Sequence, residues 1–378
     1  MNWGFILISY ISLLAFGLAD NIRGPLFFEI LNTYKLSDFA GSFVFAASSF
    51  MALVAALSNS QYSKYFHQYR MLQVGLVFMG LGFCGMGLAN SYPVMLVFVS
   101  AFGISVGTLS IAQNYLVSVG TTDRFRSRVL SGLHSMYGLA SLTAPIVASE
   151  FSKRGWTWNE IFILVGVIPL IILLGSFYKK SPPPDKIVHH DLVNGSKINR
   201  KKLFMLSFAF SLYVVSEILV STRLALYLRR DFNYDLYQSS QALFVFFILL
   251  LFGRLVSSFI HWGNYLRGAL LWSLALTTIA IVLGLLVHPW FIVFTGFTMA
   301  PFYPLAISFM SEVFPKHLQM AIGWAMTIQS FCVVSMHVVV GKFTDSFGLS
   351  AALWLGPTVS LIAFFLIFFG VKVEEAHA

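Results

Sequence analysis

Long apolar stretches separated by short polar turns dominate the pattern of this chain. An α-helix needs about 20 predominantly apolar residues to cross a bilayer. Twelve stretches of that kind are found, near 3–31, 38–58, 70–90, 93–121, 127–152, 158–178, 202–229, 238–260, 267–287, 289–314, 318–344 and 350–371. Open strands leave backbone groups unsatisfied in hydrocarbon, so helices are expected. The pattern predicts an all-α membrane protein with twelve transmembrane helices.

One long polar segment interrupts this pattern after the sixth stretch. Residues 179–202 read KKSPPPDKIVHHDLVNGSKINRKK, with three consecutive prolines and mostly basic charge. Such a composition is typical of a linker. We expect an N-terminal six-helix bundle over 1–178, a cytoplasmic linker over 179–202 and a C-terminal six-helix bundle over 203–378. His189 and His190 have no further ligands beside them, so they do not indicate a metal site.

The composition makes lipid the main solvent of the chain. Of its 378 residues, 58% are hydrophobic and 10% are charged, against about 25% charged in soluble globular proteins. Basic residues in loops beside membrane segments account for the net charge of +9, so the expected partner is the bilayer and not a nucleic acid. The first apolar stretch has no positive leader, which argues against a cleavable signal peptide. Cys84 and Cys332 lie inside apolar runs and do not indicate a disulfide framework.

The two halves of the pattern correspond to each other. At a nearly constant offset, the corresponding pairs are Asp20 with Glu217, Gly103 with Gly296, and Gly155 with Gly348. Such spacing predicts an internal duplication of six helices, as in transporters built from parallel repeats.

Four ionisable residues stand out deep in the apolar stretches, namely Asp20, Arg23, Glu217 and Arg223. A central charge costs roughly 2.5–3.5 kcal/mol on insertion scales, so such residues are functional candidates by default. Asp20 and Arg23 are three residues apart and share one helix face. They form either a structural ion pair or a proton carrier beside a cation. Glu217 has no opposite charge three or four residues away, so we expect a lone protonated carboxyl that is either a proton site or a contact between helices.

Other polar side chains in the stretches suit the recognition of hydroxyl groups. They are Asn21, Gln113, Asn114, Tyr213 and Gln329. Gln113 and Asn114 are adjacent, so at about 100° per residue at most one of them points inward. Hydrogen bonding between helices is the alternative role for each. Pro25, Pro145, Pro301 and Pro304 are expected to interrupt their helices, because proline removes a backbone hydrogen bond.

No catalytic or cofactor motif accompanies these residues. The sequence has no glycine-rich nucleotide loop with its Lys, no metal-ligand spacing and no nucleophile–base arrangement. We therefore expect no cofactor, no metal and no enzymatic activity.

Four segments carry a resemblance to a known family. They read GLADNIRGPLF (17–27), TLSIAQNYLVSVG (108–120), LYVVSEILVSTRLALYL (212–228) and GFTMAPFYPLAISFMSEVFP (296–315). With twelve spans in a 6 + 6 arrangement, they resemble the major facilitator superfamily, and within it the fucose-permease-like sugar:proton symporters. The resemblance covers nearly the whole chain. It implies a central cavity lined by spans one, four, seven and ten, a small-molecule substrate, protons as the coupling ion, a monomer, and the bacterial inner membrane.

The chain departs from that family's pattern in three places. The loop between spans two and three has Ser60 and Lys64 near the positions of the usual Gly and Asp, which puts the usual cytoplasmic gate in doubt. Ser110 stands where fucose permeases carry an acidic residue, and Arg223 stands where they often carry Trp. A cation at that position favours an anionic or amphipathic substrate.

The resulting hypothesis is a secondary active transporter of a sugar-like or other polar organic molecule. An exporter of amphipathic compounds, drugs or lipids is the alternative, and the duplicated halves argue against a third class, a membrane enzyme or receptor. Proton coupling is assigned to Asp20 and Glu217. Substrate binding is assigned to Asn21, Arg23, Gln113, Asn114, Tyr213, Arg223 and Gln329.

The distribution of Lys and Arg predicts where the termini lie. Most of the 24 basic residues fall on one side when both termini and the linker are placed together. Because positive residues are enriched on the cytoplasmic side, both termini are expected there. Single cysteines at Ser181 and at Asn233, in a background without Cys84 and Cys332, should be labelled by impermeant reagents from opposite sides. Labelling from the same side would contradict the topology.

Overall fold

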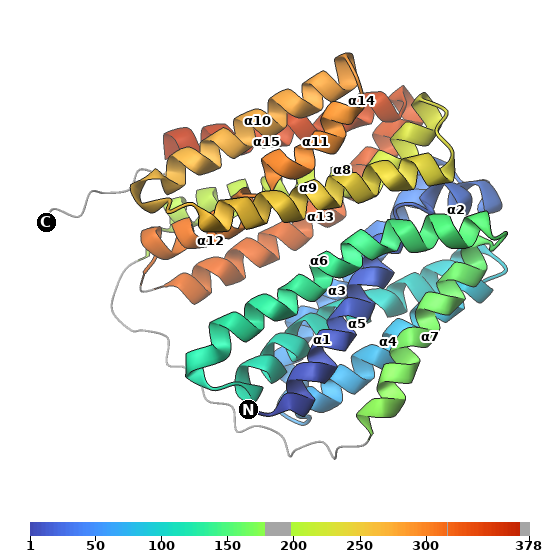
Figure 1. Cartoon of the computed structure of the whole chain (residues 1–378), viewed down its shortest axis with the longest axis horizontal. Coiled ribbons are helices and arrows are strands. Elements are labelled where there is room, and N and C mark those ends of the chain that lie inside the picture. Colours follow the sequence, from blue (N-terminus) through green and yellow to red (C-terminus); the bar gives the residue numbers. More distant parts are fainter. Residues whose placement is uncertain (178–197, 316, 371–378) are drawn as a thin grey trace, which may run out of the picture. The chain divides into compact units, whose positions relative to one another are not determined.

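The computed structural model describes residues 1–177, 198–315 and 317–370 of the chain. Throughout these residues the regular structure is helical, without strands. The helices group into two compact units, each a bundle of long helices lying alongside one another (Figure 1). Residues 235–244 group with the first unit, although the sequence places them in the second bundle.

The helices of the first unit are α1 (Trp3–Ile22), α2 (Phe27–Tyr34), α3 (Asp38–Tyr62), α4 (Gln68–Leu88), α5 (Tyr92–Gly120), α6 (Asp123–Lys153) and α7 (Trp158–Ser176). Those that follow are α8 (Arg200–Asp231), α9 (Leu236–Phe259), a 3₁₀ turn (Gly263–Tyr265), α10 (Leu266–Leu286), α11 (Trp290–Met299), α12 (Phe302–Val313), α13 (Leu318–Phe347), α14 (Leu349–Leu353) and α15 (Leu355–Gly370). Three predicted spans are each made of two helices: α1 with α2, α11 with α12, and α14 with α15. The described helices therefore account for twelve spans, as the sequence predicts.

Eleven helical stretches in the described part of the chain are long and apolar enough to cross a membrane. Helix α6, the predicted fifth span, is not among them although it has 31 residues. Its sequence is rich in small and hydroxyl-bearing residues, which lower its hydropathy. Such residues favour close packing between helices in membranes, and α6 packs along α1.

Proline breaks two of the spans but not a third. The first span is interrupted around Pro25, between α1 and α2, and the tenth around Pro301, between α11 and α12. Helix α6 runs through Pro145 without a break, so the expected interruption there is wrong. One proline removes a single backbone hydrogen bond, and the packing of α6 on α1 keeps the remaining turns together.

The predicted linker 179–202 extends too far at its C-terminal end. Residues 178–197 lie outside the described residues, and with them His189 and His190. Arg200 to Lys202 already form the first turn of α8. Asn199 caps this helix, because its side chain accepts a hydrogen bond from the Lys202 backbone N–H at 3.0 Å.

The two units repeat the same packing of helices. Helix α1 packs on α6 and helix α8 on α13, the first and fifth spans of each half. Likewise α4 packs on α7 and α10 on α15, the third and sixth spans of each half. Gly155 and Gly348, which follow the fifth and eleventh spans, both have φ of 85°, a conformation that favours glycine. The internal duplication predicted from sequence offsets is thus present in the helix packing.

Gly103 and Gly296 show the same duplication at atomic detail. A Cβ at Gly103 in α5 would lie 2.3 Å from the carbonyl oxygen of Ser48 in α3. A Cβ at Gly296 in α11 would lie 2.2 Å from the carbonyl oxygen of Phe246 in α9. In both units, therefore, the fourth span of the half touches the backbone of the second, and only glycine permits that approach.

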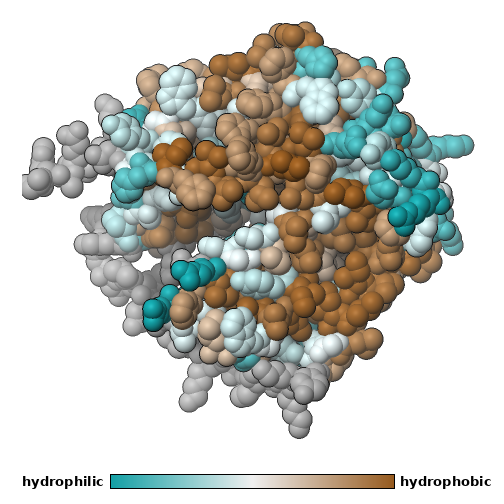
Figure 2. Space-filling view, in the orientation of Figure 1, coloured by the Kyte–Doolittle hydropathy of each residue, from teal (hydrophilic) through white to brown (hydrophobic). Residues whose placement is uncertain are grey.

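Large apolar side chains cover the outside of the bundles. Ile171 of α7 and Trp272 of α10, for example, are 62% and 69% exposed. Figure 2 shows apolar residues over most of the visible face and hydrophilic residues gathered towards its edges. Soluble monomers rarely expose large contiguous apolar patches. The exposed apolar side chains of these helices suit a surface in contact with lipid.

Adding one methyl group at the two matched glycines should destabilise the fold. We expect Gly103→Ala and Gly296→Ala each to cost about 1–3 kcal/mol of stability, the usual cost of overpacking, because the new Cβ meets a backbone carbonyl. Thermal unfolding of the purified protein in detergent measures this loss. Gly175→Ala and Gly268→Ala are the controls, since a Cβ there has no neighbour within 4 Å. Equal midpoints for all four variants would contradict the close approach.

Candidate functional site

The predicted pair of Asp20 and Arg23 is formed in the structure. Arg23 Nη2 donates to Asp20 Oδ1 at 2.5 Å, and Arg23 Nε donates to the Asp20 backbone carbonyl at 3.3 Å. Both residues lie at the end of α1, where the chain leaves the helix ahead of Pro25. The i, i+3 spacing therefore gave the correct partner.

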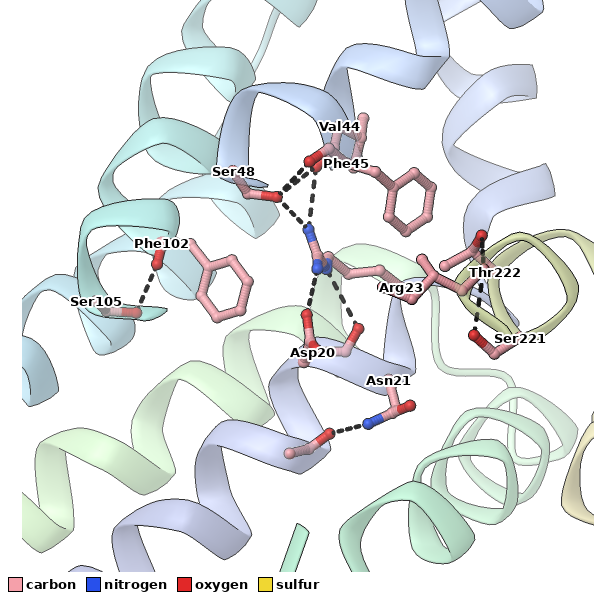
Figure 3. Close-up of polar contacts among 12 residues, drawn as sticks. Asp20, Asn21, Arg23, Val44, Phe45, Ser48, Phe102, Ser105, Ser221 and Thr222 are labelled. Atoms are coloured by element: carbon pink, nitrogen blue, oxygen red, sulfur yellow. Dashed lines mark hydrogen bonds and ion pairs between the residues drawn. The ribbon is translucent and has the colours of Figure 1, made fainter. Parts of the chain in front are cut away.

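Arg23 is held on every side by groups of the first unit. Its Nη1 donates to the Val44 carbonyl at 3.0 Å and to Ser48 Oγ at 2.8 Å, both on α3. Its guanidinium lies 5.1 Å from the ring centre of Phe45 and 4.8 Å from that of Phe102 (Figure 3). The side chain is only 6% exposed. These contacts occupy its donors and its faces, which favours a role in positioning Asp20.

Tyr137 completes the surroundings of Asp20. Its hydroxyl, on α6, donates to Asp20 Oδ2 at 2.7 Å. The Asp20 side chain, 28% exposed, thus divides its two oxygens between a guanidinium and a phenol. Nothing in the sequence pointed to Tyr137, because the contact joins residues 117 positions apart.

Glu217 is paired in the structure, so the expectation of a lone carboxyl is wrong. Arg254 Nη2 of α9 lies 3.2 Å from Glu217 Oε1. The Tyr213 hydroxyl lies 2.5 Å from Glu217 Oε2. The countercharge comes from a neighbouring helix, 37 residues away, and spacing along α8 could not have identified it. The Glu217 side chain is 20% exposed.

The two units therefore contain the same arrangement of groups. In each, a carboxylate on the first helix of the half binds an arginine through one oxygen and a tyrosine hydroxyl through the other. We call these the Asp20 cluster (Asp20, Arg23, Tyr137) and the Glu217 cluster (Glu217, Arg254, Tyr213). Hydrogen bonds to an ionised carboxylate are shorter and stronger than those between neutral groups. Protonation would weaken both contacts at once.

Three of the other predicted residues donate hydrogen bonds to groups of the first unit. Asn21 Nδ2 donates to the Gly17 carbonyl at 2.8 Å, and Asn114 Nδ2 donates to the Ser110 carbonyl at 2.7 Å, each within its own helix. Gln113 of α5 is fully buried, and its Nε2 donates to Ser12 Oγ of α1 at 2.9 Å. These contacts favour helix packing for Gln113, and substrate binding by all three stays a prediction.

Tyr213, Arg223 and Gln329 lie in the second unit. Tyr213 is fully buried and belongs to the Glu217 cluster. Arg223 is 2% exposed on α8. Gln329 lies half-buried in α13, with an Oε1 that has no hydrogen-bond partner among the described residues. Their contact with a substrate also stays a prediction.

Other kinds of site find no support in the part of the chain that the structure describes. No group of three or more His, Cys, Asp or Glu side chains there could hold a metal ion. Cys84 and Cys332 are free thiols.

Comparison with known proteins decides the family. The family model of the Major Facilitator Superfamily matches residues 9–291. The chain belongs to the major facilitator superfamily.

Two bacterial relatives illustrate its place in this superfamily. The chain is 21% identical to "Protein TsgA homolog" of Buchnera aphidicola subsp. Baizongia pistaciae (strain Bp), over 96% of this chain and 94% of the relative. It is 20% identical to "Protein TsgA homolog" of Yersinia pestis (strain Pestoides F), over 95% of this chain and 93% of the relative.

Solved structures of the superfamily share the fold. A bacterial homologue of the human lysosomal transporter Spinster, inward-facing and unoccupied, aligns with a TM-score of 0.80 at 12% identity, over 97% of this chain and 96% of that one. A D-xylose-proton symporter aligns with a TM-score of 0.80 at 13% identity, over 98% of each chain. The nucleoside transporter NupG aligns with a TM-score of 0.77 at 14% identity, over 97% of this chain and all of that one.

Membership of the superfamily makes the chain an integral membrane transport protein and not an enzyme. The sequence prediction of a twelve-helix facilitator fold is confirmed.

A double-mutant cycle should reveal coupling within the Asp20 cluster. We expect Asp20→Asn and Arg23→Gln each to destabilise the protein, and the double variant to lose less than their sum, by about 0.5–3 kcal/mol, because each single change leaves the other group without its countercharge. Thermal unfolding in detergent provides the measurement. Glu150 and Lys153, an exposed pair at the same spacing, form the control cycle and should be close to additive. Additive effects at Asp20 and Arg23 would show that the pair is not coupled.

Proposed function

We propose that the chain is a proton-driven secondary transporter of a small polar organic solute, such as a sugar, working by alternating access. Asp20 and Glu217 are the proton-coupling residues in this proposal. The observation that carries it is that two carboxylates inside the helical bundles are each hydrogen-bonded by an arginine and a tyrosine. Ionisable groups retained at such cost inside a membrane protein mark ion and proton pathways.

The clusters suggest how a proton would act at Glu217. When the carboxyl is ionised, it attracts the Arg254 guanidinium and accepts a hydrogen bond from the Tyr213 hydroxyl. When a proton binds, the ion pair with Arg254 loses its charge attraction. Proton and guanidinium therefore compete for one carboxylate. A transporter that alternates between two environments can load and release its proton by changing that competition.

The proposed substrate class rests on the amide side chains of the chain and on the names of two structural neighbours. Asn21, Gln113, Asn114 and Gln329 offer amide groups suited to hydroxyl-bearing solutes. Two structural neighbours carry names of that kind, a D-xylose-proton symporter and a nucleoside transporter. We further propose import by a monomer in a bacterial inner membrane, with both termini in the cytoplasm. The bacterial relatives and the basic linker support that placement.

A second candidate is an exporter of amphipathic compounds, drugs or lipids. Arg223, nearly fully buried on α8, favours it, because a guanidinium in such a place suits an anionic head group. Under this hypothesis protons would drive efflux. Purified protein in lipid vesicles would distinguish the two candidates, by the direction in which a pH gradient moves the solute.

Removing the titratable group at Glu217 should uncouple transport from protons. Glu217→Gln keeps the size of the side chain and one acceptor oxygen but cannot ionise. We expect it to exchange substrate across the membrane and to lose accumulation driven by a pH gradient. Purified protein in lipid vesicles, supplied with a panel of radiolabelled sugars and nucleosides, gives both rates.

Glu150→Gln serves as the matched control, since that carboxylate is 44% exposed and outside both clusters. It should accumulate solute like the unchanged protein. Undiminished gradient-driven accumulation by Glu217→Gln would rule out the coupling role of Glu217 and leave Asp20 as the remaining candidate.

A further inference from the structure

The break between α11 and α12 leaves backbone carbonyls that need partners. The last carbonyls of a helix have no partner within it, and Pro301 has no N–H to offer. In a bilayer such groups must be satisfied by other parts of the protein. Ser273 of α10 donates to the Thr298 carbonyl at 2.6 Å. The Tyr213 hydroxyl of α8 lies 2.8 Å from the Met299 carbonyl.

The Tyr213 hydroxyl therefore faces two acceptors. One is the Met299 carbonyl at the break, and the other is Glu217 Oε2 at 2.5 Å. A phenol has one proton to donate, so it can satisfy only one of them at a time. Its ring cannot turn aside, because it is fully buried and stacks on Phe302 of α12 with 4.1 Å between ring centres. The charge on Glu217 decides which acceptor attracts the proton more strongly.

The helix that carries the countercharge also touches the break. A Cβ at Gly253, next to Arg254 on α9, would lie 2.6 Å from Ala300 Cβ. Apart from Tyr213 on its own helix, Glu217 is paired with Arg254 of α9 and lies within electrostatic range of the Tyr303 phenol of α12. Helices α13 and α15 also pack on α8 and supply no ion-pair or hydrogen-bond partner of Glu217 among the described residues. The cluster and the break thus form one connected structure.

We infer that Tyr213 is a positioning residue that transmits the protonation of Glu217 to the break between α11 and α12. With Glu217 ionised, the Tyr213 hydroxyl donates its hydrogen bond to Oε2, and the Met299 carbonyl loses that donor. With Glu217 protonated, the hydroxyl donates to Met299 and caps α11. The angle between α11 and α12 then follows the proton. This inference rests on the proposed function, since it requires Glu217 to exchange protons.

The test needs no substrate. The protein lacking Cys84 and Cys332 carries spin labels at Phe294 on α11 and Ser308 on α12. Both positions are exposed and lie on either side of the break, so the labels report the geometry of the break. Pulsed electron paramagnetic resonance gives the distance between labels across a pH series. Infrared spectroscopy follows the carboxylic C=O band of Glu217, identified as the band absent in Glu217→Gln.

We expect the band and the label distance to titrate together in the otherwise unchanged protein. Tyr213→Phe keeps the stacked ring and removes only the hydroxyl. In this variant the Glu217 band should still titrate, while the pH-dependent shift in label distance should be lost. Tyr303→Phe is the matched control, because it removes a phenol near Glu217 that has no hydrogen bond to Met299. It should keep both titrations.

Three results would overturn the inference, and they separate it from the proposed function. A distance shift that persists in Tyr213→Phe would show that the link does not run through this hydroxyl. A Glu217 band that titrates without any distance shift would remove the link and leave proton coupling by Glu217 intact. A band that does not titrate would remove both, because no proton would then reach Glu217.

Discussion

A charged group inside a helical bundle in lipid must find its partners within the protein. This constraint determines which helices can meet in each unit. The Asp20 cluster joins α1 to α6 through Tyr137 and to α3 through Arg23. The Glu217 cluster joins α8 to α9 through Arg254. Buried ion pairs add little net stability, since desolvation offsets their attraction. Between α8 and α9 the effect of the pair is to fix the helix register, because any shift along the axis would separate Glu217 from Arg254. In the Asp20 cluster, the hydrogen bonds to Tyr137 of α6 and Ser48 of α3 have this effect.

The sequence predicted what depends on local spacing. Hydropathy located the helices, prolines located the breaks in the first and tenth spans, and the i, i+3 rule paired Asp20 with Arg23. It missed Tyr137 and Arg254, which come from other helices. Arg254 becomes a countercharge only through its contact with Glu217 on another helix, and no periodicity of a single helix contains that information.

The duplication of the chain is preserved in geometry more than in residue identity. Gly103 and Gly296 make the same approach to a backbone carbonyl, and both units hold a carboxylate between an arginine and a tyrosine. The arginine, however, comes from the same helix in one unit and from the next span in the other. The tyrosine shows the reverse, lying on another helix in the first unit and on the same helix in the second. The same electrostatic requirement has thus been met twice with different residues.

The close approach at Gly103 also has a consequence for how genetic variation in this protein should be interpreted. The backbone oxygen that faces Gly103 belongs to Ser48, whose side chain holds the guanidinium of Arg23. A bulkier residue at Gly103 pushes Ser48, and with it the cation that orients Asp20. An inactive allele at this glycine would therefore mimic a defect in the carboxylate itself, although the altered residue carries no polar group. Compensating second-site changes should arise on the facing turn of α3, where space can be recovered.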